Sequence, residues 1–208
     1  MAASRYSLEQ DLRILEAMAS ELKDYLLKDI LYWRLDGPAS FPLMTLGGYL
    51  LRLHRAEALI GRPEPAGHEV PVQSGGAALR DARREFETQT RAWALRAATK
   101  YQQELDARLK LLAEYLGELE TGAAAAGHWP HEAEIRTIVA LLLDAARGAF
   151  DVAPYEVRVR ALDVSLERRL EPSNFVGDPA LEVAYPRETF WWMWRKTGIG
   201  QRAAGNGL

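Results

Sequence analysis

The chain has 208 residues, of which 48% are hydrophobic and 26% are charged, the composition of a globular protein and not of a disordered one. Its 26 basic and 29 acidic residues give a formal net charge of -3, which argues against a nucleic-acid-binding protein because no overall positive field attracts phosphates. The absence of cysteine excludes disulfides, thiolate zinc sites, iron–sulfur clusters and cysteine nucleophiles.

The hydropathy pattern predicts a soluble protein. No stretch approaches the roughly 20 apolar residues that cross a bilayer. The segment Met1–Gln10 lacks the basic stretch and following apolar run of a secretory signal. We therefore expect a cytoplasmic location and no transmembrane segment.

The first predicted helix spans residues 7–35. Ser7 and Gln10 have the spacing of a capping box. Apolar residues then recur every three or four positions as far as Trp33, and Gly37 with Pro38 ends the pattern. This regular spacing predicts a rod that buries one face.

The second predicted helix spans residues 43–60. Gly47 and Gly48 fall inside it, where each glycine costs about 1 kcal/mol relative to alanine. The pair indicates either a close crossing with another helix or a kink, or else a helix that begins only after Gly48. Both interpretations stay open at this point.

A loop over residues 61–76, rich in glycine and proline, precedes the third predicted helix. We expect this loop to be a spacer along the length of the bundle. Residues 77–120 then carry an apolar stripe with steps of three or four throughout. A straight rod of this length, about 65 Å, exceeds a typical small domain. Either the rod bends, or part of it projects and packs on a second subunit, which favours a homodimer.

The fourth predicted helix spans residues 132–150, and its wide apolar arc indicates a largely buried helix. Residues 151–197 form a predicted extension. Within it, residues 155–171 fit a helix better than a strand, because no partner strand is visible, and a short helix is expected over 186–196. The fold class is therefore all-α: a single domain over 1–197 with four main helices, followed by a flexible tail over 198–208.

The densest aromatic segment of the chain lies in the predicted extension and comprises Phe190, Trp191, Trp192, Met193 and Trp194. These side chains cannot all lie on one helix face. One interpretation is that they plug the open end of the bundle. A second is a docking surface, because Trp and Met are enriched in interface cores, and a third is a peripheral membrane contact.

Signals for catalysis or metal binding are weak. A metal site in a helical bundle needs inward-facing ligands on several helices, and this chain offers only His54 with Glu57, in the reverse of the usual order. Glu21 with Asp24 is typical of a solvated helix face. Phosphate-binding glycine motifs and the Gly-x-Ser-x-Gly motif are absent from the sequence. We therefore predict no cofactor.

These observations favour a non-enzymatic interaction or scaffold protein that contacts a protein partner or a second copy of itself. The alternative is a small-molecule or metal-binding helical bundle, acting as an enzyme, that uses His54, Glu57 and nearby carboxylates. Convergence of His54 and several carboxylates on one internal pocket would favour this alternative.

Overall fold

The structure is a computed structural model that describes residues 6–61, 72–121 and 127–198. Helices dominate these residues, and the all-α prediction is confirmed. The α-helices are α1 (Leu8–Leu27), α2 (Leu46–Ile60), α3 (Val72–Ala92), α4 (Ala94–Thr121), α5 (Trp129–Ala146) and α6 (Ala153–Glu167). Short 3-10 helices follow at Pro179–Ala184 and Trp191–Trp194, and the strands β1 (Leu170–Pro172) and β2 (Arg195–Thr197) form an antiparallel pair.

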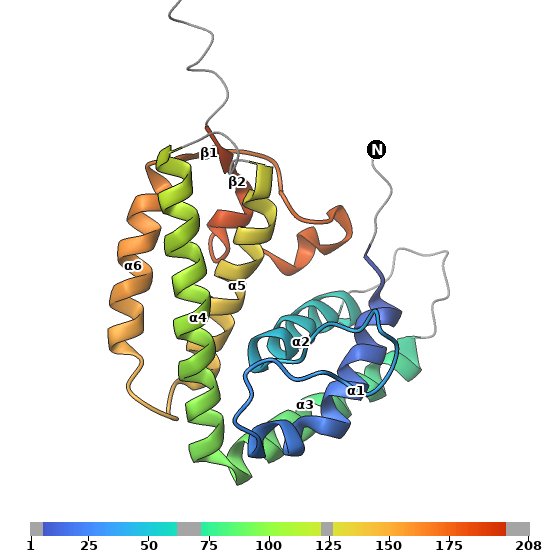
Figure 1. The fold of residues 1–208 in the computed structure, drawn as a ribbon. Coiled ribbons are helices and arrows are strands. Elements are labelled where there is room, and N and C mark those ends of the chain that lie inside the picture. Colours follow the sequence, from blue (N-terminus) through green and yellow to red (C-terminus); the bar gives the residue numbers. More distant parts are fainter. Residues whose placement is uncertain (1–5, 62–71, 122–126, 199–208) are drawn as a thin grey trace, which may run out of the picture.

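The helices form two groups that cross each other (Figure 1). Helices α4, α5 and α6 lie side by side in one group, with β1 and β2 at one end. Helices α1, α2 and α3 form the other group, in which α1 packs along α3. Helix α2 contacts α5 and α4 and therefore joins the two groups.

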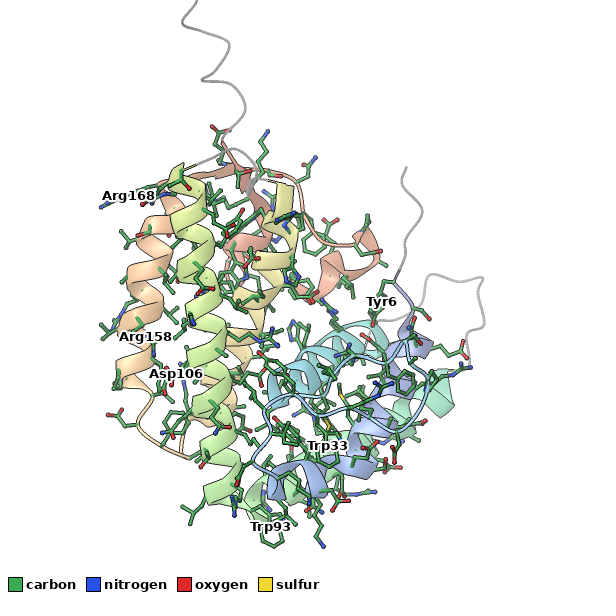
Figure 2. All side chains as sticks on the ribbon, in the orientation of Figure 1. Tyr6, Trp33, Trp93, Asp106, Arg158 and Arg168 are labelled. Carbon is green, nitrogen blue, oxygen red and sulfur yellow. The ribbon has the colours of Figure 1, made fainter. Side chains whose placement is uncertain are left out.

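Two clusters of buried side chains stabilise this arrangement. The larger cluster draws on all six helices, with Leu22, Tyr49 and Leu105 among its fully buried members. The smaller cluster joins the end of α4 and the start of α5 to the C-terminal segment, around Trp129 and Tyr185. Arg158 of α6 also reaches Asp106 of α4 at 2.5 Å (Figure 2).

The first helix is shorter than predicted. It ends at Leu27, and Lys28 continues in an extended conformation. Two features hold the chain after it: Trp33 pairs with Met44 in an antiparallel bridge, and Glu21 accepts hydrogen bonds from the Trp33 indole (2.6 Å) and the Asp36 amide (2.8 Å). The prediction of helix to residue 35 was wrong because these tertiary contacts outweigh the helical periodicity.

The third predicted rod bends at Trp93 and becomes α3 and α4. The Thr90 hydroxyl donates to the Phe86 carbonyl at 2.7 Å, a bond of the kind that often bends helices. The bend lets the stripe change partners, because α3 packs on α1 and α2 whereas α4 packs on α5 and α6. Because the predicted rod bends, its length no longer supports the predicted homodimer.

The glycine pair of the second helix marks a close crossing. Helix α2 begins at Leu46, and a Cβ at Gly47 would lie 2.4 Å from Ile138 Cγ2 and 2.6 Å from Glu104 Oε1. The Gly47 amide donates to Glu104 Oε2 at 2.8 Å, so a buried carboxylate caps the helix N-terminus. Residue 47 must therefore be glycine for α2 to approach α4 and α5 this closely.

The remaining predictions hold only in part. The helix predicted over 155–171 is confirmed as far as Glu167, but Leu170 and Glu171 belong to β1, which does have a partner strand. The helix predicted over 132–150 is α5, which begins earlier, at Trp129, and ends at Ala146. Helix α3 begins at Val72, so residues 72–76, which were predicted to belong to the loop, are helical. Apart from Gly61, the rest of the predicted loop lies outside the described residues. The expected helix over 186–196 is instead a 3-10 turn followed by β2, which pairs with β1.

Of the predicted tail, only Gly198 is described, and its amide donates to the Arg169 carbonyl at 3.2 Å. Among the helices of the described residues, none is long and apolar enough to cross a membrane.

Candidate functional site

A groove of about 710 Å³ lies between α3 and α5, with α2 and the start of α4 completing its walls. This volume is within the range of small-molecule sites. The residues that line it are Leu50, Leu53, His54, Glu57, Arg83, Phe86, Glu87, Thr90, Arg91, Ala94, Ala97, Tyr101, Leu141, Asp144, Ala145, Arg147, Gly148 and Ala149.

The groove has apolar walls. Leu53 and Phe86 are almost fully buried and belong to the large core cluster, so these walls are rigidly supported. Leu50 and Leu141 are half-buried and pack against the same cluster. An apolar part of a ligand placed here would be removed from water against preformed surface.

Tyr101 adds a polar group to these walls. The residue as a whole is only 3% exposed, and its hydroxyl makes no hydrogen bond to any residue that the structure describes. Burial, and to a smaller extent the charge of Glu104, raises the pKa of Tyr101, so its hydroxyl stays protonated. The hydroxyl can therefore donate to an acceptor in the groove.

The charged residues of the groove differ in their pairing. Arg83 forms ion pairs with Glu57 and, at 3.6 Å, with Glu87. Arg91 has no ionic partner in the described part of the chain, and Arg147 has only a long, exposed contact of 3.5 Å with Glu156. Asp144 is the one lining acid without an ion pair to a described residue. Two arginines are thus available to an anion.

His54 lines the groove but is held by the C-terminal segment. Its Nε2 lies 2.7 Å from the Ala184 carbonyl, which only accepts, so this nitrogen donates and Nδ1 carries the lone pair. The ring packs against Tyr185 and Phe190. Burial lowers the pKa of His54 more than the bond to Ala184 raises it, which favours the neutral ring.

The structure brings His54 and Glu57 to one groove together with Glu87 and Asp144, as the alternative prediction requires. These groups do not converge as ligands: within residues 6–61, 72–121 and 127–198, no group of three or more His, Asp or Glu side chains could hold a metal ion. Glu57 is paired with Arg83 instead.

The aromatic segment 190–194 is divided between core and surface. Phe190, Trp192 and Met193 are buried in the smaller cluster, whereas Trp191 and Trp194 are partly exposed. The Trp192 indole donates to Thr137 Oγ1 at 3.0 Å, and the Trp194 indole donates to the Tyr185 carbonyl at 2.8 Å. A docking role for this segment stays a prediction, and it would fall on Trp191 and Trp194.

A buried ionic network joins α1, α2 and α5. Asp11 lies 3.3 Å from Arg52, and Arg55 contacts Glu134 and donates to the Tyr185 hydroxyl at 2.8 Å. Burial raises the pKa of Asp11, although the neighbouring arginines oppose this. Each of these charges faces an opposite charge, although Asp11 Oδ2 and Arg52 Nε are buried without a hydrogen bond to a described residue.

Sequence reasoning missed the groove residues outside α2. Tyr101 falls on the apolar stripe of residues 77–120 and has the spacing of a core residue, and Arg91 and Arg147 resemble any exposed arginine. No local motif marks them, because they meet only after the chain bends at Trp93. In comparisons with known proteins, no family model, curated protein or solved structure matches this chain.

Proposed function

We propose that this protein is a non-enzymatic binding protein whose groove between α3 and α5 takes an organic anion with an apolar body. The observation that carries this proposal is the Tyr101 side chain, which lines the groove and whose hydroxyl has no hydrogen-bond partner among the described residues. A ligand oxygen that accepts from this hydroxyl would gain a hydrogen bond in a largely apolar setting.

The other groove features define the ligand class. Leu50, Leu53 and Phe86 offer an apolar surface, and Arg91 and Arg147 offer two guanidinium groups. Guanidinium groups form charge-assisted hydrogen bonds with carboxylate, sulfonate or phosphate oxygens. An elongated molecule with a carboxylate or a similar group therefore matches the groove better than a cation or a purely apolar compound does.

The proposal is tested with 8-anilinonaphthalene-1-sulfonate, an apolar anion whose fluorescence rises when it leaves water. We expect saturable binding to the folded chain. Ala145→Phe fills the groove and abolishes this binding, and Arg147→Ala weakens it about tenfold, which corresponds to about 1.4 kcal/mol for a lost charge-assisted bond.

Arg160→Ala is the matched control, because Arg160 is exposed on α6 and has no ionic partner in the described residues. The control should bind the probe like the parent chain. Unchanged fluorescence in Ala145→Phe and Arg147→Ala, with both variants folded by circular dichroism, would refute the groove as the binding site.

A further inference from the structure

Large apolar side chains are exposed at the end of the molecule where α3 meets α4. Leu95 is 87% exposed and Ile30 is 51% exposed. Figure 2 places Trp93 at the extreme end of the molecule, opposite β1 and β2. We call these side chains the elbow patch: Leu27, Ile30, Tyr32, Trp93 and Leu95.

The two segments of the elbow patch are held together by polar contacts. Arg96 lies 2.9 Å from Asp29. The Lys100 ammonium, itself buried, donates to the Lys28 carbonyl at 2.7 Å and to the Ile30 carbonyl. The chain after α1 is thereby fixed against the first turns of α4, and its apolar side chains share one end of the molecule with Trp93 and Leu95.

The two segments that carry the elbow patch have a positive formal charge, although the whole chain has a negative one. Residues 27–32 and 91–96 include three basic side chains (Lys28, Arg91 and Arg96) and one acidic side chain (Asp29), a formal net charge of +2, whereas the whole chain carries -3. Within the described residues, Lys28 has no acidic partner, and neither has Arg91, which also lines the groove. The charge of Lys28 is therefore available to a negatively charged surface.

We propose that the elbow patch is a membrane-contact surface that places Trp93 and Leu95 at the headgroup level of a bilayer containing anionic lipid. Tryptophan and tyrosine are enriched at this level because their rings have an apolar body and a polar edge. Burial of the apolar side chains and attraction between basic residues and anionic lipids both contribute to such binding.

The charge of the patch favours a membrane over a second copy of the chain. In a two-fold symmetric dimer the same patch would face itself. Two surfaces with a net charge of +2 would then be brought together, and juxtaposed like charges oppose association. Anionic lipid headgroups, in contrast, attract the same positive charge.

The full chain is sedimented with vesicles of phosphatidylcholine and phosphatidylserine in equal parts, and with vesicles of phosphatidylcholine alone. We expect binding to the mixed vesicles that weakens as salt is added, and weaker binding to phosphatidylcholine. Leu95→Glu should bind the mixed vesicles at least about tenfold less, since it removes apolar area and adds a repelled charge.

Val157→Glu is the matched control, because Val157 is a 58% exposed apolar residue on α6. It should bind the mixed vesicles like the parent chain. An equal loss in both variants, or no binding by the parent chain, would overturn the proposal. A two-chain mass in solution that Leu95→Glu reduces to one chain would assign the patch to self-association and overturn it as well.

Discussion

Two tryptophans of this protein have opposite surroundings. Trp192 is 3% exposed, its indole donates to Thr137, and the Arg136 guanidinium lies 4.0 Å from the centre of its ring. Trp93 is 36% exposed, and its indole N–H has no acceptor among the described residues. The aromatic-rich segment 190–194 is thus largely core, whereas a tryptophan in a regular helical stripe reaches the surface.

This difference shows that the density of aromatic residues in a sequence does not distinguish core from surface. What distinguishes them is whether the fold supplies an acceptor for the indole N–H and a neighbour for the ring. Thr137 and Arg136 supply both to Trp192 from α5, and Thr137 is 55 residues away in the sequence.

The largest expected effect is the stability difference between Trp192→Ala and Trp93→Ala. Trp192→Ala should cost about 3–5 kcal/mol, because it leaves a cavity in the smaller core cluster. Trp93→Ala should cost about 1 kcal/mol, because only part of its area leaves water on folding. Denaturant unfolding followed by circular dichroism measures both values, and equal losses would contradict the contrast between the two sites.

An intermediate effect is expected for Thr137→Val, which keeps the shape of the side chain but removes the acceptor of the Trp192 indole. A buried donor without a partner costs about 1–3 kcal/mol. Thr99→Val on α4 is the matched control, because the exposed Thr99 hydroxyl donates only to the Leu95 carbonyl in the same helix. This control should change the free energy of unfolding by about 0.5 kcal/mol or less. If both changes have the same cost, the indole bond does not stabilise the cluster.

The smallest expected effect is on the pH dependence of the free energy of unfolding. Because burial lowers the pKa of His54, the unfolded chain takes up a proton near pH 6.5 that the folded chain resists, and stability falls as the pH drops below this value. His54→Gln keeps a donor for the Ala184 carbonyl but removes the titration.

The unfolding free energy is therefore measured at about pH 7.5 and about pH 5.5, on either side of the ordinary histidine value. His54→Gln should lose less stability on acidification than the parent chain does. His131→Gln, at the exposed start of α5, is the control and should follow the parent. Taking the difference from the parent also removes the opposite contribution of Asp11, whose pKa is raised. Parallel pH profiles for all three proteins would contradict the shift.

Much of the fold follows from local sequence features. The three-and-four spacing of apolar residues predicts the helices, and Ser7 caps α1 as its spacing indicates, with the Gln10 amide donating to its hydroxyl at 3.2 Å. The end of α1 and the position of the bend at Trp93 could not be predicted, because contacts made by Glu21, Lys100 and neighbouring helices decide them.

The candidate site was less predictable than the fold. His54 and Glu57 were named from their spacing, and they do line the groove, but their partners Ala184 and Arg83 come from other elements. Tyr101 could not be distinguished from its buried neighbours, because the missing partner of its hydroxyl is a property of the folded chain alone.

The single hydrogen atom that serves as the side chain of Gly47 has an effect at a distance. Gly47 does not line the groove, but it lets α2 sit deep between α4 and α5, and α2 carries Leu50, Leu53, His54 and Glu57. A methyl group at this position would push α2 outward and make the groove shallower. If the groove binds a ligand as proposed, the affinity is open to adjustment from a residue that the ligand does not touch.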